Sequence, residues 1–130
     1  MPFDWNEYLN LAEELRRRTD EEACLRSAIS RAYYAVYCQA YYFLLELGYQ
    51  ISEKESKHIT VWKIYESKLQ GTTASGVGIN GGRLLKNRVR ADYEAEINRD
   101  ELPDLVEKSF RFARNALTFL NQIKSARSGS

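Results

Sequence analysis

The segment Leu25–Leu47, LRSAISRAYYAVYCQAYYFLLEL, decides the fold of this 130-residue chain. Apolar side chains recur along it every three or four residues, and a second, tyrosine-rich stripe occupies the opposite face. This periodicity predicts a helix, and one that is apolar nearly all round lies at the centre of a bundle or continues into a partner subunit. Gln39 and Glu46 interrupt the stretch, which falls short of the ~20 apolar residues that a membrane span needs. We therefore expect a buried helix and no membrane partner.

Helical periodicity continues through almost the whole remainder of the chain. The fold class that it predicts is all-α, an up-and-down bundle of four to five helices. The helices are expected over residues 5–18, 19–47, 53–70 and 83–95 and from 103 onward. A single domain is expected over residues 1–125, followed by a disordered tail over 126–130.

Residues 71–82, GTTASGVGINGG, are the most glycine-rich part of the chain and are predicted to form its one long loop. The spacing Gly76-x-Gly78-x-x-Gly81 is that of a dinucleotide-binding fingerprint, which requires a preceding strand. A helix is predicted before it instead. A flexible connection between helices is the interpretation that fits best, and the alternative is a loop that orders when a partner or nucleic acid docks beside it.

The composition excludes several classes of protein. Lys plus Arg is 19 against 18 Asp plus Glu, a net charge of +1, so any site for nucleic acid must be a local patch. One histidine excludes zinc sites built from several histidines, and Cys24 and Cys38 have no metal-ligand spacing. We expect no metal or cofactor. Reduced thiols in a cytoplasmic protein are the simplest interpretation of the two cysteines.

The segment 83–95 carries the most informative charges. Arg88 and Asp92, four residues apart, fall within its apolar face, which is costly unless the two ions satisfy each other or other buried groups. One hypothesis is a buried pair that holds this helix against its neighbours. The other is an arginine at a cleft for phosphate, with Asp92 orienting its guanidinium. A set of basic residues could guide an RNA or nucleotide backbone: Arg83, Lys86, Arg88 and Arg90.

Aromatic residues and the single histidine suggest interfaces rather than catalysis. His58 shares a helical face with Trp62 and Tyr65, and it is interpreted as a core or interface residue that lies away from Arg88 in the sequence. The second face of the long central helix predicts a homodimer. Its interface residues are expected to be Arg31, Tyr34, Cys38 and Tyr41.

Two segments together resemble the HEPN domain family (higher eukaryotes and prokaryotes nucleotide-binding). They are Ser27–Tyr37, SAISRAYYAVY, and the pattern R-x-x-A-D-Y from Arg88 to Tyr93. The resemblance implies a helical bundle that dimerises, with the arginine-bearing helices meeting at a cleft. It also implies a place in a toxin–antitoxin, stress or defence system, with RNA or a nucleotide as ligand. A nucleotidyltransferase-type antitoxin is the partner that it implies.

The chain departs from this family at two histidines. Many HEPN proteins are metal-independent ribonucleases with an arginine, four to six residues and then a histidine, whereas here the fifth position after Arg88 is Tyr93. Cys38 likewise follows Tyr37 where the family usually has histidine. Three hypotheses result: a dimeric module that binds RNA or a nucleotide, a ribonuclease, and a non-catalytic interaction module. The ribonuclease would use Arg88, Asp92 and Tyr93 as candidate catalytic residues, with His58 as a second candidate for proton transfer.

Overall fold

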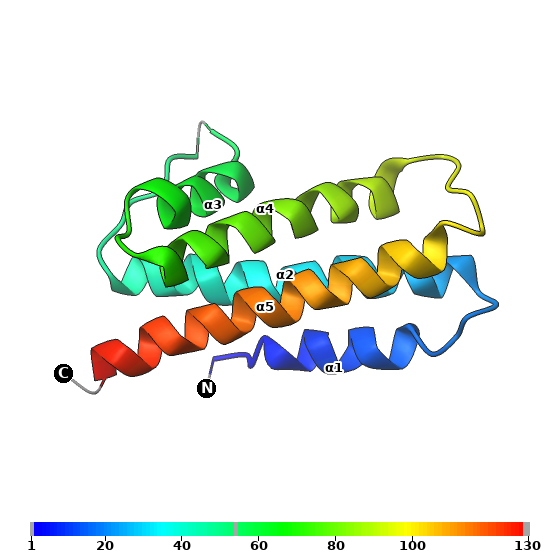
Figure 1. Ribbon diagram of the computed structural model, residues 1–130, viewed down its shortest axis with the longest axis horizontal. Coiled ribbons are helices and arrows are strands. Elements are labelled where there is room, and N and C mark those ends of the chain that lie inside the picture. Colours follow the sequence, from blue (N-terminus) through cyan, green and yellow to red (C-terminus); the bar gives the residue numbers. More distant parts are fainter. Residues whose placement is uncertain (1, 54, 129–130) are drawn as a thin grey trace.

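A computed structural model describes residues 2–53 and 55–128 of the chain. These residues form five helices joined by short connections (Figure 1). They are α1 (Asn6–Leu15), α2 (Glu22–Glu46), α3 (Lys57–Ser67), α4 (Thr72–Tyr93) and α5 (Leu102–Ser128). The described residues contain no strand. The predicted all-α fold class is therefore confirmed, with five helices.

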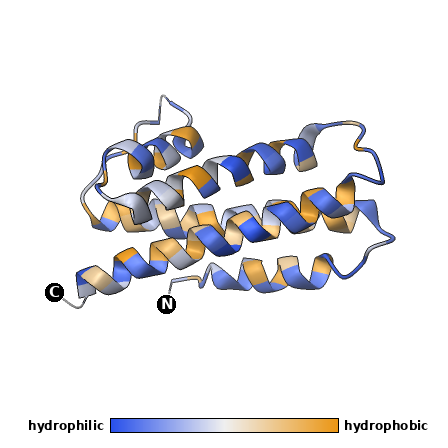
Figure 2. Cartoon of the chain, in the orientation of Figure 1, coloured by the Kyte–Doolittle hydropathy of each residue, from blue (hydrophilic) through white to orange (hydrophobic). Residues whose placement is uncertain are grey.

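Helix α2 is the central element of the bundle, as its sequence predicts. α1, α4 and α5 all pack against α2, and α3 packs mainly against α4. Figure 1 shows α1, α2, α4 and α5 running in alternating directions along the molecule, with α3 beside α4 near one end. Hydrophobic and hydrophilic residues alternate along the helices (Figure 2), as expected for helices that each bury one side. Twelve residues of α2 are buried, which explains why this helix is apolar nearly all round.

The predicted loop over residues 71–82 is wrong, because α4 begins at Thr72 and this stretch is its first half. Only Gly71 belongs to a turn, with a φ of 106° that glycine adopts without a steric penalty. A glycine inside a helix costs about 1 kcal/mol relative to alanine, so local propensity favours a loop here. Contacts with other helices override that preference.

Three glycines of α4 lie where neighbouring helices come close to its backbone. A Cβ atom on Gly76 would lie 2.6 Å from the ring of Phe119 in α5, and one on Gly78 would lie 2.6 Å from the carbonyl oxygen of Trp62 in α3. Gly81 faces the indole ring of Trp62 with no room for a Cβ atom. Residues without a side chain allow these close approaches. The glycines therefore serve helix packing.

The ends of the helices differ from the predictions by a few residues; α2 is Glu22–Glu46 rather than 19–47, and α3 is Lys57–Ser67 rather than 53–70. α1 ends at Leu15 rather than Arg18, and α5 begins at Leu102, one residue before Pro103. α5 remains helical to Ser128, whereas the tail was predicted from residue 126. Residues 129 and 130 of that predicted tail lie outside the described residues.

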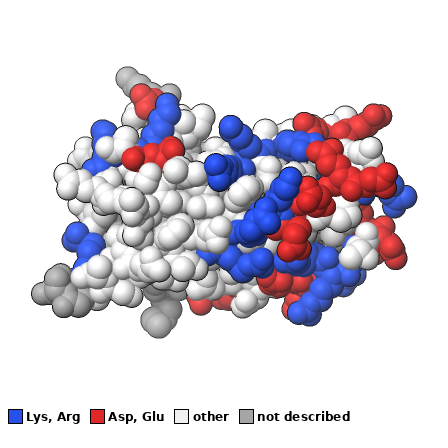
Figure 3. All heavy atoms as spheres, in the orientation of Figure 1, with Lys and Arg blue, Asp and Glu red and all other residues white. Residues whose placement is uncertain are grey.

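Charged side chains gather at one end of the molecule. Figure 3 shows basic and acidic side chains intermixed at the end where the α1–α2 and α4–α5 connections lie, while the other end of this face is mostly uncharged. Such mixing fits the small net charge of the chain. No helix in the described part of the chain is long and apolar enough to cross a lipid bilayer.

Candidate functional site

Arg88 and Asp92 form the ion pair that their spacing predicts. Nε of Arg88 donates to Oδ2 of Asp92 at 2.8 Å, and Oγ of Ser30 in α2 donates to the same oxygen at 3.3 Å. The two side chains are only 13% and 24% exposed, so water screens the pair less than it screens a surface pair. The contact with Ser30 holds Asp92 against α2, and Asp92 in turn orients the guanidinium of Arg88.

Two arginines lie over the ring of Tyr34. Cζ of Arg31 and Cζ of Arg88 are each 5.1 Å from the centroid of its ring. Both guanidinium groups are attracted to the face of this ring, but they repel each other. Arg31 also lies over the ring of Tyr8 at 4.8 Å and forms no ion pair with any residue that the structure describes. An anion bound between the two arginines would relieve their repulsion.

These residues line a groove of about 360 Å³ formed by α1, α2 and α4. Its lining contains two guanidinium groups, one carboxylate and three aromatic rings: Trp5, Tyr8, Ser30, Arg31, Tyr34, Cys38, Arg88 and Asp92. Guanidinium groups bind phosphate oxygens through paired N–H donors, and aromatic rings stack on nucleobases. The groove therefore has the chemistry of a site for a phosphate-bearing aromatic ligand. We refer to it as the arginine groove.

A chain of hydrogen bonds connects α2 with α3 beside this groove. The hydroxyl of Tyr33 lies 2.7 Å from Nδ1 of His58, and it accepts a hydrogen bond from Nε1 of Trp62 at 3.1 Å. The Trp62 nitrogen can only donate, whereas the direction of the Tyr33–His58 hydrogen bond depends on which ring nitrogen of His58 carries the proton. Burial also raises the pKa of the Tyr33 hydroxyl, which keeps it protonated.

The structure brings His58 close to Arg88, although the two are far apart in the sequence. The ring of Tyr34, 5.1 Å from Cζ of Arg88, has its centroid 5.9 Å from the centroid of His58. Burial, and secondly the charge of Arg88, hold the pKa of His58 below its usual value. His58 stacks on Tyr37 at 4.1 Å between ring centroids. It is thus a neutral group beside the arginine groove.

Three other predicted site residues have different surroundings. Cys38 lines the arginine groove, and burial raises the pKa of its thiol to about 11, so it carries little thiolate at neutral pH. Tyr41 lies outside the groove lining and stacks on Tyr37 at 5.8 Å. Tyr93 is 72% exposed at the end of α4, with its ring centroid 5.7 Å from Cζ of Arg88. Three of the four predicted dimer residues therefore share one groove with Arg88 and Asp92.

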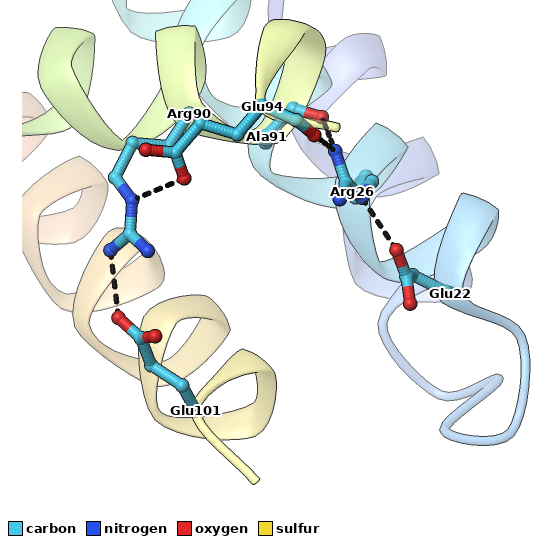
Figure 4. Close-up of polar contacts among 6 residues, drawn as sticks. All are labelled: Glu22, Arg26, Arg90, Ala91, Glu94 and Glu101. Carbon is cyan, nitrogen blue, oxygen red and sulfur yellow. Dashed lines mark hydrogen bonds and ion pairs between the residues drawn. The ribbon is translucent and has the colours of Figure 1, made fainter. Parts of the chain in front are cut away.

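The other predicted basic residues do not join Arg88. Arg83 lies over the ring of Phe112 in α5 at 5.9 Å, and Lys86 lines a separate groove between α3 and α4. Arg90 donates to Glu94 and pairs with Glu101, each at 2.9 Å (Figure 4). Those two carboxylates raise the pKa of Arg90. In the described structure Arg90 therefore connects the end of α4 with the start of α5.

Arg26 holds the C-terminal end of α4 in place, a role that its sequence position does not reveal. Its Nη1 donates to the carbonyl oxygens of Ala91 and Glu94 at 3.1 and 2.6 Å, and its Nε donates to Glu22 at 2.9 Å (Figure 4). A cation at a helix C-terminus satisfies carbonyls that lack a partner and is favoured by the helix dipole. Arg26 therefore fixes the turn of α4 on which Asp92 lies.

Some residues of the arginine groove could not be recognised from the sequence. Trp5 directly precedes α1 and Tyr8 lies in it. Their place depends on how α1 packs against α2, for which no local pattern exists. Ser30 had a signal, because it precedes Tyr34 by one helical turn on the same face of α2. Among the described residues, no three His, Cys, Asp or Glu side chains are grouped as metal ligands.

Comparisons of the chain with models of protein families, with curated proteins and with solved structures give no match.

Proposed function

We propose that the chain is a HEPN-like module that binds RNA or a nucleotide in the arginine groove. The observation that carries the proposal is the convergence of Arg31 and Arg88 on the ring of Tyr34. The structure gives the Nη atoms of these two arginines no hydrogen-bond partner among the described residues. They are therefore available for phosphate oxygens, and the adjoining rings of Trp5 and Tyr8 provide faces for stacking bases.

A homodimer is part of this proposal. Phe3 and Tyr42 are 46% and 49% exposed, and both contact Trp5, which lines the arginine groove. An aromatic surface continuous with the groove would let a second copy extend the site. Sedimentation at micromolar concentration should show a dimer that Tyr42→Glu weakens. A wild-type protein that remains monomeric would remove this part of the proposal and leave the ligand site intact.

The cellular setting of the proposal comes from the resemblance in Ser27–Tyr37 and Arg88–Tyr93. It comprises a toxin–antitoxin, stress or defence system, with a nucleotidyltransferase-type antitoxin as partner. Both cysteines are free thiols, which fits a reducing cytoplasm.

Binding of a labelled single-stranded RNA, followed by fluorescence anisotropy, tests the ligand site. Arg31→Gln should weaken binding about tenfold, because one guanidinium of the phosphate site is lost. It should also reduce the slope of log K against log salt concentration by about 0.7, the value for one phosphate contact to a single strand. Arg114→Gln is the matched control, since Arg114 is exposed on α5 and the change in net charge is the same. Equal effects of the two substitutions would contradict the proposed site.

The position of His58 favours a second candidate function, a metal-independent ribonuclease. Arg88 could stabilise charge on a phosphate while a neutral His58, with its proton on Nδ1 facing the Tyr33 hydroxyl, accepts a proton at Nε2. These are the two tasks of such catalysis. RNA cleavage by the purified protein in excess EDTA is then expected, and His58→Gln and Arg88→Lys should each abolish it. Absence of cleavage across a panel of RNAs would leave the binding function alone.

A further inference from the structure

A second groove, of about 450 Å³, lies between α3 and α4. It shares no lining residue with the arginine groove. Its apolar lining consists of Ile59 and Trp62 from α3, and Leu85 and Val89 from α4. Ile59 and Val89 are 49% and 43% exposed, which is unusual for large apolar residues that face each other across a groove. We call this surface the apolar groove.

Gly82 lines the apolar groove and differs from the other glycines inside α4. A Cβ atom on Gly76, Gly78 or Gly81 would collide with a neighbouring helix, but one on Gly82 would meet nothing within 4 Å. A glycine inside a helix costs about 1 kcal/mol relative to alanine, and no contact within the described chain offsets this cost at Gly82. The missing side chain leaves the backbone of α4 open to close approach from outside.

The charges beside the apolar groove indicate what kind of surface fits it. Lys63 and Lys86 line the groove and form no ion pair with a residue in the described ranges. Glu66 is the single carboxylate in the lining, so the groove carries a net positive charge. An occupant with acidic groups beside its apolar surface would match this arrangement.

The shape of the apolar groove favours a helix as its occupant. From Gly82 to Val89 the groove follows two turns of α4, about 10 Å. An amphipathic helix presents anchors at positions i, i+3, i+4 and i+7 over the same length. The lining residues Ile59 and Val89 remain nearly half exposed, so the groove is too open to enclose a small ligand, which is usually 70–90% buried in its site.

We propose that the apolar groove between α3 and α4 is the docking site for an amphipathic helix of a partner protein that carries Asp or Glu beside its apolar anchors. The apolar side chains of that helix contact Ile59, Leu85 and Val89, its backbone crosses α4 closely at Gly82, and its carboxylates pair with Lys63 and Lys86. The docking site is independent of the ligand in the arginine groove.

Two fluorescein-labelled helical peptides of opposite charge test the proposal on the wild-type protein. Both carry leucine at i, i+3, i+4 and i+7 over two repeats, and the flanking positions are all glutamate in one peptide and all lysine in the other. Fluorescence anisotropy should show saturable binding of the acidic peptide, at least tenfold tighter than the basic one and weaker at high salt. The double variant Lys63→Gln/Lys86→Gln should remove this preference.

A substitution that fills the groove gives the sharper test. Gly82→Leu should weaken binding of the acidic peptide at least tenfold while leaving the melting temperature equal or higher, since leucine favours a helix. Ala23→Leu is the matched control, because it adds leucine at an exposed position of α2. The proposal is overturned by an acidic peptide that does not bind at 1 mM, by equal binding of the two peptides, or by unchanged binding to Gly82→Leu. It is also overturned if the wild-type protein is a dimer that Gly82→Leu converts to a monomer, because the occupant is then a second copy.

Discussion

The two halves of α4 are held in the bundle by different kinds of contact. Residues 72–82 pack through glycines, so that the backbone of α4 lies against α3 and against Phe119 of α5. Residues 83–93 bury Leu84 and Ala91 and add polar contacts that the first half lacks: Arg88 with Asp92, Arg90 with Glu101, and Arg26 with the carbonyl of Ala91. The first half fixes the separation between helices, and the second half presents charge.

This difference means that residues 72–82 serve the packing of the bundle, whereas residues 83–93 contribute to the candidate site. A contact between a backbone and a ring has no slack, and one added methyl group forces the helices apart. An arginine instead has five donors and can exchange one partner for another, so a ligand can use the second half of α4 without disturbing the first. We therefore expect substitutions at Gly76, Gly78 and Gly81 to lower stability. Substitutions in the arginine half should change RNA binding more than stability.

The largest effect is expected from Gly78→Ala. The new Cβ would lie 2.6 Å from the carbonyl oxygen of Trp62 and 2.9 Å from the backbone nitrogen of Glu66, and neither atom can move without moving α3. Overpacking of this kind costs about 1–3 kcal/mol in free energy of unfolding. Urea unfolding followed by circular dichroism measures the change.

Gly82→Ala is the matched control for that substitution, because it adds the same methyl group four residues further along α4 into open space. It should raise the free energy of unfolding by about 0.5–1 kcal/mol through helix propensity. If both substitutions changed the free energy of unfolding in the same direction, close packing would not distinguish Gly78 from Gly82.

The same comparison explains which features the sequence could predict. The periodicity of Leu25–Leu47 and the spacing of Arg88 and Asp92 are local, because residues three or four apart on one helix meet whatever the rest of the chain does. The helical state of residues 72–82 is set by Trp62 and Phe119, which no local pattern connects to these glycines. Local propensity therefore predicts a loop for residues 72–82, and only the packing of the whole bundle makes them helical.

The candidate site likewise contains residues that the sequence could bring together and residues that it could not. Arg88 and Asp92 were found from one helix, but their neighbours Arg31 and Tyr34 come from α2 and were assigned to a separate dimer interface. His58 comes from α3, and its proximity to Arg88 depends on how α3 packs against α4. Charges within one helix can be paired from sequence, whereas a site formed by several helices requires their relative positions.

An effect of intermediate size is expected from Arg88→Met. It leaves the carboxylate of Asp92 partly buried with Ser30 as its remaining donor, and it should lower the free energy of unfolding by about 1–2 kcal/mol. The double variant Arg88→Met/Asp92→Leu removes both charges and should recover at least half of that loss. A double variant less stable than Arg88→Met would mean that Asp92 makes stabilising contacts other than its ion pair with Arg88. RNA binding should be lost in both variants.

The smallest expected effect connects the arginine half of α4 to α3 through His58. Burial, and secondly the charge of Arg88, hold the pKa of His58 below its usual value of 6.5. The chain has one histidine, so its Cε1 proton gives a single titrating resonance in an NMR spectrum. Arg88→Met should move this pKa upward, but not fully to 6.5, because burial remains. Arg114→Gln should leave it unchanged.

The direction of the pH effect on stability follows from the same lowered pKa. Between the native pKa of His58 and 6.5 the unfolded chain binds a proton that the native protein does not, so the free energy of unfolding rises with pH in this window. The contribution of His58 is fully present above pH 6.5 and is lost as the pH falls toward its native pKa. Urea unfolding at pH 7.5 and pH 5.5 should therefore show a loss at the lower pH that His58→Gln reduces. A wild-type pKa at or above 6.5 would show that His58 is not buried beside Arg88.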